Sequence, residues 1–411
     1  MALLQNLADE LLVQIASYLF RSDLSRVSRV SRRINRITTP FLYNEIWLGS
    51  CNESSIDLQL FIRTLLTTPG GETLAALVHN LHLAWSCEVM PLYHEDQILF
   101  SSAARGFGFD KLQMTESGQV ILLLHLLPHV HTLDVFPPDE SWEFSDFMES
   151  LSPLQPITTL PMAFRSLRYW DCSVSTLALL TLLRLPHIRF ITMPAPCGMY
   201  FTDEEAFIAA TMSSTVTHLK IPSARINPTE LLTILQTPRA LTHFSFYPRS
   251  ININYNFQAF RTALAPLQSS LTNLVLYYWT TRTLNTHHGG PSTTIGSLRD
   301  WPVLRSLHCS LLPILGLGLP GESRDIARVL PVCIRELEIL DDQFWTPDDA
   351  LHEAVVMVRE KKAVLPQLRR LVVYSRGGGD AVARERLRRA CVDAGVANMD
   401  YIVKPVAEYT T

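Results

Sequence analysis

The chain has 411 residues, of which 47% are hydrophobic and 18% are charged, and its formal net charge is −4. This length is sufficient for a large core or for several domains, while the small negative charge excludes a global basic field that would attract nucleic acid or an acidic membrane. The seven cysteines are scattered without a Cys-x-x-Cys pair, which favours a reducing compartment and argues against a disulfide framework.

No segment has the pattern of a targeting or membrane signal. The first residues include Asp9 and Glu10 and no basic residue, which is unlike a secretory signal peptide. The densest apolar run, from Val120 to Leu127, is far shorter than the roughly 20 residues that cross a bilayer, and it contains His125. We expect a cytoplasmic and/or nuclear protein with neither a membrane nor a nucleic-acid partner.

Residues 5–48 are predicted to form a small helical module. Apolar residues recur at helical spacing from Leu7 to Leu19, with two acidic residues in the first turn, where the helix dipole favours them. Three short helices in this length bury little surface, so the module is expected to rest on a partner or on the following domain.

The later part of this module has its own helix signals. Ser22 is a candidate N-cap for a second helix, and a helical stripe continues from Leu24 to Ile37. Pro40 fits the end of this stripe, because proline removes a backbone donor and its ring clashes with the preceding turn.

The string LADELLVQIASYLFRSDLSRVSRVSRRINRI resembles an F-box, and the segment TPFLYNEIWL that follows is similar to the corresponding segment in many fungal members. The matching residues are Leu7, Glu10, Leu11, Leu12, Ile15, Tyr18, Leu19, Asp23, Leu24, Val27, Ser28, Val30 and Arg32. Two positions depart from the family pattern: Ala8 stands where proline is usual, and Ile34 where tryptophan is usual.

The resemblance implies that the three helices dock on the Skp adaptor of a cullin–RING ubiquitin ligase. The adaptor-binding residues that it implies are Leu7, Glu10, Leu11, Ile15, Leu19, Leu24, Val27, Val30 and Ile34. A second interpretation stays open, in which the helices only cap the domain that follows, and the two roles are compatible. Six arginines from Arg21 to Arg36 are interpreted either as a solvated helix face or as a site for an acidic partner or a phosphate backbone.

A six-residue phrase (apolar, two variable, apolar, one variable, apolar) recurs ten times after the module. Its central residues are Leu81, Leu133, Leu167, Ile188, Leu219, Phe244, Leu274, Leu307, Leu337 and Leu371. The mean period is roughly 32 residues, within the range of repeat architectures. Helical patterns separate many of the phrases, at residues 117–127, 175–185, 202–212, 228–236, 256–267, 347–361 and 380–394.

Alternating strands and helices predict a parallel sheet with right-handed crossovers. Residues 75–376 resemble leucine-rich repeats, which implies that the strands line a concave face and the helices the opposite face. Only Cys172 occupies the place where that family has Asn or Cys, so we expect no asparagine ladder. The predicted fold is α/β: an F-box module at 1–48, then an irregular leucine-rich-repeat-like solenoid of about ten units at 49–411.

The variable positions of the phrase should point to solvent, because successive side chains of a strand alternate sides. The candidate substrate-binding residues among them are Arg168, His187, Arg189, His218, Lys220 and His243. Arginine forks match carboxylates and phosphates, which favours a target segment that is acidic or phosphorylated. The alternative is that exposed strand positions are simply polar. Two insertions, at 86–116 and 280–294, have no readable role.

No catalytic or metal signature stands out. A proline separates His125 from His129 and His131, and no carboxylate or cysteine in local register completes a metal site. The glycines at 377–379 lack the lysine and the spacing of a phosphate-binding loop. We therefore expect no enzyme activity and no cofactor. The predicted function is the substrate-recognition subunit of an SCF-type ligase in the ubiquitin-conjugation pathway; the alternative is a protein–protein interaction scaffold with no ligase link.

Overall fold

The computed structural model gives two compact units, residues Met1–Ser173 and Val174–Thr411, and each is described by itself. The structure describes residues 6–49, 56–84, 92–110, 112–136, 165–169, 179, 182–183, 185, 187–193, 214–224, 228–250, 257–277, 279–280, 294–315, 326–340, 347–374, 381–396 and 399–402. The helical patterns at 202–212 and most of 175–185, Cys172, the glycines at 377–379 and nearly all of the insertion at 280–294 lie outside these residues.

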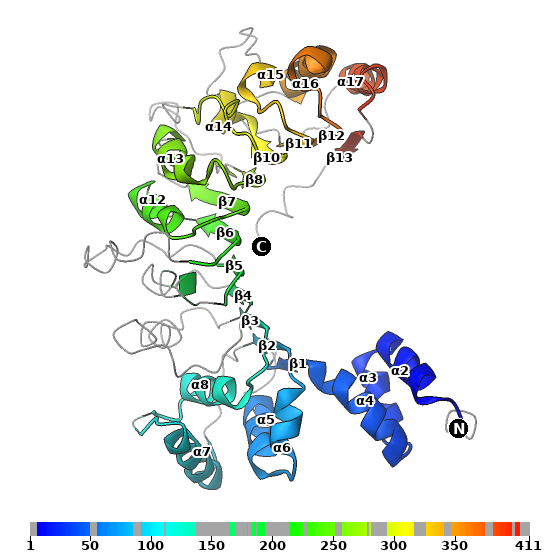
Figure 1. The fold of residues 1–411 in the computed structure, drawn as a ribbon, viewed down its shortest axis with the longest axis vertical. Coiled ribbons are helices and arrows are strands. Elements are labelled where there is room, and N and C mark those ends of the chain that lie inside the picture. The colour runs from blue at the N-terminus through cyan, green and yellow to red at the C-terminus, as the bar shows by residue number, and fades with distance from the viewer. Residues whose placement is uncertain are drawn as a thin grey trace. The chain divides into compact units, whose positions relative to one another are not determined.

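The first unit begins with the predicted three helices (Figure 1): α2 (Asp9–Tyr18), α3 (Arg21–Ser28) and α4 (Arg32–Asn44). Buried apolar side chains from all three make its small core, namely Leu12, Ala16, Leu24, Ile34 and Ile37. We refer to residues 6–44 as the helical module.

Two local predictions for this module were wrong. Helix α3 begins at Arg21, so Ser22 lies inside it, and the side-chain cap belongs to Ser31, whose hydroxyl accepts a hydrogen bond from the Ile34 N–H at 3.2 Å. Pro40 lies inside α4 rather than ending it. Both Pro40 and Arg36 are exposed, so water can satisfy the Arg36 carbonyl that the proline leaves without a helical donor.

Helix α4 runs directly into β1 (Glu45–Leu48), the first strand of a parallel sheet. It pairs with β2 (Asn80–Ala84), which pairs with β3 (Thr132–Phe136), and β3 pairs with β4 (Ser166–Tyr169). Helices α5 (Ile56–Thr67), α6 (Gly71–Ala76), α7 (His94–Gly106) and α8 (Glu116–Leu126) complete the unit. Helix α7 lies in the insertion at 86–116, where the fully buried Phe100 anchors it.

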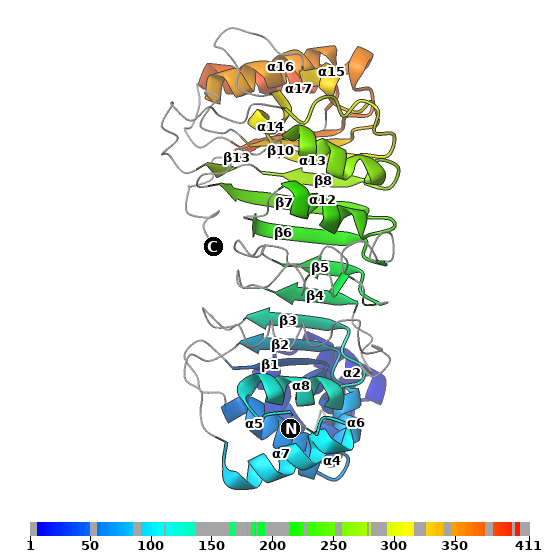
Figure 2. The same cartoon turned by 90° about the vertical axis from the view of Figure 1, so that its left-hand side faces the viewer.

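The second unit is a parallel sheet whose main strands follow chain order (Figure 2). The strands are β5 (Phe190–Thr192), β6 (His218–Ala224), β7 (His243–Ser250), β8 (Asn273–Leu276), β10 (Ser306–Ser310), β11 (Glu336–Leu340), β12 (Arg370–Tyr374) and β13 (Met399–Ile402). The short β9 (Trp279–Thr280) pairs with the end of β7.

The helices of this unit are α12 (Pro228–Gln236), α13 (Phe257–Leu264), the 3-10 helix η2 (Ala265–Leu267), α14 (Leu311–Leu315), α15 (Ile326–Val329), α16 (Pro347–Val364) and α17 (Ala381–Asp393). Four of the predicted helical patterns, at 228–236, 256–267, 347–361 and 380–394, coincide with described helices of this unit, whereas α14 and α15 were not predicted. Helices α12 and α13 lie on one side of β6–β8, so the opposite side of these strands carries the variable residues (Figure 1).

The hydrophobic phrase explains the sheet. Its apolar residues are buried, and those of neighbouring repeats stand in register, as in the pairs Leu219–Phe244 and Leu307–Leu337. Residues between them alternate to the partly exposed side, as the burial of β2 and β8 shows. Among the described residues, no helix has the length and apolar composition needed to cross a membrane.

The repeat around β5 was predicted in the wrong register. Ile191, not Ile188, stands opposite Leu219, and Phe190 is exposed rather than buried. Ile188, Ile191 and Met193 supply the buried residues there. This shift of three residues removes His187 from the strand face and places it in the preceding turn, where it is exposed.

Candidate partner-binding surfaces

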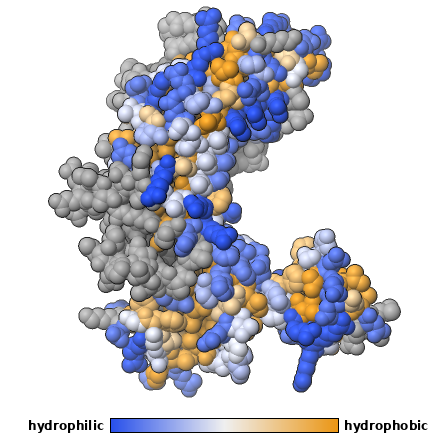
Figure 3. Space-filling model, in the orientation of Figure 1, coloured by the Kyte–Doolittle hydropathy of each residue, from blue (hydrophilic) through white to orange (hydrophobic). Residues whose placement is uncertain are grey.

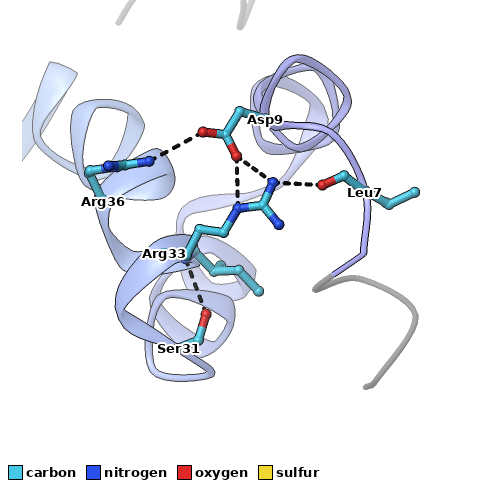
Figure 4. Close-up of polar contacts among 6 residues, drawn as sticks. Leu7, Asp9, Ser31, Arg33 and Arg36 are labelled. Atoms are coloured by element: carbon cyan, nitrogen blue, oxygen red, sulfur yellow. Dashed lines mark hydrogen bonds and ion pairs between the residues drawn. The ribbon is translucent and has the colours of Figure 1, made fainter.

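An arginine–carboxylate contact ties α2 to α4 (Figure 4). The Arg33 guanidinium donates from Nε to Asp9 Oδ1 at 2.8 Å and from Nη2 to the Leu7 carbonyl at 2.7 Å, while Arg36 Nη2 donates to Asp9 Oδ2 at 3.2 Å. The hydrogen bond from Arg33 is the main reason why the pKa of Asp9 lies below its usual value. Arg33 and Arg36 therefore both pair with Asp9 within the module, while most of the Arg36 side chain stays exposed.

Opposite the core, α2 exposes a row of large apolar side chains. Leu11, Ile15 and Tyr18 are spaced by four and three residues, so they lie on one helix face, and we call them the α2 apolar face. Tyr18 is 86% exposed, and Phe20, which follows the helix, is 81% exposed. Figure 3 shows hydrophobic residues at the surface of this module. An exposed apolar row on a small module is typical of a protein-docking surface.

The predicted adaptor-binding residues divide into three groups. Glu10, Leu11 and Ile15 are exposed, and Leu7, Leu19, Val27 and Val30 are partly exposed. Leu24 and Ile34 are only 5% and 2% exposed, because they form the core between the helices, so they do not lie on the exposed surface of the module. The resemblance matched Tyr18 but did not assign it to the binding surface, although its spacing from Leu11 and Ile15 indicates that it lies on the same helix face. Phe20 was not predicted.

In the first unit, four residues stand in one row across β1–β4: Trp47, His82, Asp134 and Arg168. The Trp47 and His82 rings are stacked 3.8 Å apart, and His82 Nδ1 lies 3.0 Å from Asp134 Oδ2. Arg168 Nη1 lies 3.8 Å from the same carboxylate oxygen. Arg168 is therefore partly neutralised by a buried partner that the sequence did not reveal.

In the second unit, the residues just before the strands form a hydrogen-bonded ladder. The Thr217 carbonyl accepts from the Thr242 N–H at 2.8 Å and from the Thr242 hydroxyl at 3.0 Å. Thr272 repeats this arrangement on Thr242, and the Thr217 hydroxyl donates to the Arg189 carbonyl at 3.2 Å. Threonine hydroxyls at the strand starts thus link successive repeats in a chain whose sequence lacks the asparagine ladder.

His218 and His243 stack on each other next to this ladder. Their ring centroids are 3.9 Å apart, and Phe190 continues the stack at 4.2 Å from His218. Each Nδ1 lies 2.9 Å from the hydroxyl of the preceding threonine. Because those hydroxyls donate to carbonyls, we assign the proton to Nδ1, which leaves Nε2 as an acceptor. Burial lowers the pKa of both imidazoles, so both are neutral at neutral pH.

The remaining predicted substrate-binding residues do not form one cationic site with these histidines. Arg189 Nη1 donates to the Thr215 carbonyl at 2.7 Å, and Lys220 lies over the Tyr247 ring at 5.7 Å from its centroid. His187 lies in a turn, and Arg168 belongs to the first unit. Around β5–β7 the described residues of this face therefore include a stack of aromatic rings, with Arg189 and Lys220 as exposed cations.

A polar network links β8, β10 and β11. The Tyr277 hydroxyl donates to Glu338, His308 Nδ1 lies 3.2 Å from Glu338 Oε2, and Ser306 Oγ lies 3.0 Å from His308 Nε2. Burial and the bond to Glu338 raise the pKa of Tyr277.

The order serine, histidine, glutamate is that of a nucleophile, a base and an orienting acid. Ser306, however, is 8% exposed, and the Arg305 and Ser306 N–H groups donate to the Thr272 carbonyl, so they cannot stabilise an oxyanion. The geometry thus supports a network that holds three strands together. Within the described residues, no group of three or more His, Cys, Asp or Glu side chains is placed to hold a metal ion.

Comparison with known proteins identifies one part of the chain. Residues 4–48 match the F-box-like family. No curated protein matches the chain. The chain therefore carries an F-box-like domain at its N-terminal end, a class of domain that typically binds Skp-type adaptors and is generally not catalytic.

Proposed function

We propose that this protein is a substrate receptor of an SCF-type ubiquitin ligase, in which the helical module docks on a Skp-type adaptor and the sheet face captures a target protein. The observation that carries the proposal is the coincidence of the F-box-like match at residues 4–48 with the exposed α2 apolar face. A small module whose core is already formed by Leu12, Leu24 and Ile34 has no internal use for Leu11, Ile15 and Tyr18.

The mechanism would be proximity. Binding a target to the same assembly that holds the conjugating enzyme raises the effective concentration of the target's lysines at that enzyme. The parallel strands in chain order, with helices between them, support a leucine-rich-repeat-like domain as the target-binding part, since repeat domains of this kind present long polar surfaces. No catalytic residue of this chain is required.

The test is capture of a Skp-type adaptor, co-expressed with the full chain. We expect the natural chain to retain the adaptor, and a Leu11→Arg/Tyr18→Asp variant to lose it without a change in thermal unfolding, because both side chains are exposed. The matched control is Val382→Arg/Val392→Asp, which changes two exposed apolar residues on α17. Failure of the natural chain to bind the adaptor would overturn the proposal, as would equal binding by all three proteins.

The alternative, a scaffold whose helices only cap the repeats, is favoured by one observation. Helix α4 ends at Asn44 and β1 begins at Glu45, so the module continues directly into the first strand of the sheet. This also limits deletion experiments, because removing residues 1–48 takes β1 away from β2. Point variants on the α2 apolar face separate the two functions, since a pure cap tolerates them without loss of any partner.

A further inference from the structure

Three arginines occupy equivalent positions just before β10, β11 and β12. The Arg335 N–H donates to the Arg305 carbonyl at 2.7 Å, and the Arg369 N–H donates to the Arg335 carbonyl at 2.8 Å. Neighbouring strands of a sheet are about 4.8 Å apart, so these residues are evenly spaced across the strands. Arg370, the first residue of β12, adds a fourth guanidinium, and we call the four residues the arginine column.

The column lacks counter-ions within the part of the chain that the structure describes. Arg305, Arg369 and Arg370 are exposed, and Arg335 is partly exposed. No ion pair joins any of the four to a carboxylate there; Arg335 Nε instead lies 3.5 Å from the amide oxygen of Gln367. Glu336 stands opposite Arg370 in the strand register without forming an ion pair with it.

Several other arginines of the chain form ion pairs with carboxylates. Arg33 pairs with Asp9, Arg63 with Asp96, and Arg388 with Glu385. The column thus combines four positive charges with one neighbouring carboxylate, on adjacent strands where like charges repel each other. A bound anion would relieve that repulsion, and the guanidinium fork matches the oxygens of carboxylates and phosphates.

Residues on neighbouring strands help to locate the positive charge in the second unit. Around β5–β7, where several of the predicted substrate-binding residues lie, the two stacked imidazoles are neutral and the Arg189 guanidinium donates to a carbonyl. On the strands next to the column, the carboxylate of Glu338 is already engaged by Tyr277 and His308. Within the described part of the second unit, four arginines without a carboxylate partner therefore lie together at the start of β10–β12.

We propose that Arg305, Arg335, Arg369 and Arg370 bind an anionic segment of the target protein, one that carries several carboxylate or phosphate groups and runs across the strands. This assignment rests on the proposed receptor function and specifies the chemistry of its target. Anionic groups repeated along an extended segment can contact successive arginines, since side chains on one face of a strand recur about every 6.8 Å.

The experiment measures fluorescence anisotropy of labelled Gly-Ser peptides with the purified full chain. The three probes carry four aspartates, four phosphoserines or four serines in the same positions. We expect the first two to bind and the third not to bind, with affinity falling as salt is raised. The comparison of aspartate with phosphoserine distinguishes the two sources of negative charge.

Two variants with equal charge make the test specific. Arg305→Gln/Arg335→Gln/Arg369→Gln should weaken anionic peptide binding at least about tenfold. Arg21→Gln/Arg26→Gln/Arg29→Gln removes three exposed arginines from the helical module and should leave it unchanged. Thermal unfolding of both variants checks that the fold is retained.

Several outcomes would overturn the assignment: no salt-sensitive binding by either anionic peptide, equal losses in both variants, or stronger binding of an oligonucleotide of the same charge. The assay contains no adaptor, so its result is separate from the capture experiment. Adaptor capture without peptide binding would rule out the arginine column as a binding site and leave the receptor function standing. Peptide binding without adaptor capture would rule out the receptor function and leave the arginine column as an anion-binding site.

Discussion

The helical module and the strands of the second unit present different chemistry to solvent. The module hides a minimal core and exposes Leu11, Ile15 and Tyr18, whereas the strands of the second unit cover a larger core and present partly exposed histidines and threonines together with exposed arginines. An apolar face derives binding energy from area removed from water, while a charged row derives selectivity from the pairing of specific groups. The first suits a constant partner and the second suits a selected one.

The largest effect on the contrast between these two regions is expected from a change in the core of the helical module. Ile34→Asp places a carboxylate in the core between the helices and should cost about 4 kcal/mol, enough to unfold the module. Leu11→Asp, at an exposed position of the same module, should leave its unfolding unchanged. Hydrogen exchange of α2–α4 compares the two, and equal protection in both variants would contradict the assigned core.

A core substitution in the second unit should cause a loss of stability of similar size, but in a different part of the molecule. Phe244 is fully buried and packs near Phe246 and Phe260, so Phe244→Ala should destabilise this unit by about 3–5 kcal/mol. We expect the loss of hydrogen-exchange protection to appear in β6–β8 and not in α2–α4. Equal loss in both places would show that the two units unfold together.

A smaller effect is expected at the cap of α4. Ser31→Ala removes the acceptor for the Ile34 N–H and should destabilise the module by about 1 kcal/mol. Ser31→Asn keeps an acceptor at the same position and serves as the control. The measurement is the denaturation midpoint, and identical midpoints for the two variants would contradict the capping role.

The smallest effect concerns pH and the stacked imidazoles. The folded pKa values of His218 and His243 lie below the usual value of about 6.5, so the unfolded chain binds protons first as pH falls. Their contribution to stability should be complete above about pH 6.5 and should decline below it, until the folded imidazoles titrate as well. His218→Gln/His243→Gln should flatten this slope, as measured by denaturation at several pH values. An unchanged slope would contradict their neutral state.

Much of the strand order follows from the hydrophobic phrase, because apolar residues at a fixed spacing can be buried only on one side of a sheet. Three strands were nevertheless missed: the two-residue β9, and two strands that carry the phrase. Tyr43–Ile46–Leu48 and Val396–Met399–Tyr401 have the same phrase and lie at β1 and β13. The phrase near β5 fits two registers, three residues apart, and only burial distinguishes them.

The surfaces were less predictable than the fold. Asp9 and Arg33 are 24 residues apart in the chain, and Asp134 and Arg168 come from different strands, so which arginines are neutralised depends on tertiary placement. For the same reason, the candidate substrate-binding residues predicted from the sequence lie between Arg168 and His243, whereas the arginine column lies later in the chain. Leu24 and Ile34 follow the apolar pattern as well as Leu11 does, and only the packing of three helices separates core from surface.

The direct passage from α4 into β1 has a mechanical consequence. No loop residue separates Asn44 from Glu45, and β1 is fixed to β2 over its four residues, so the junction has no free joint. In a ligase assembly, an adaptor bound to α2 would therefore also fix the orientation of β1 and of the strands that pair with it. Glycines inserted between Asn44 and Glu45 would make this orientation variable, while the adaptor contact and the target contact would both be kept. The range of target lysines that are modified should therefore broaden before the affinity for the target changes.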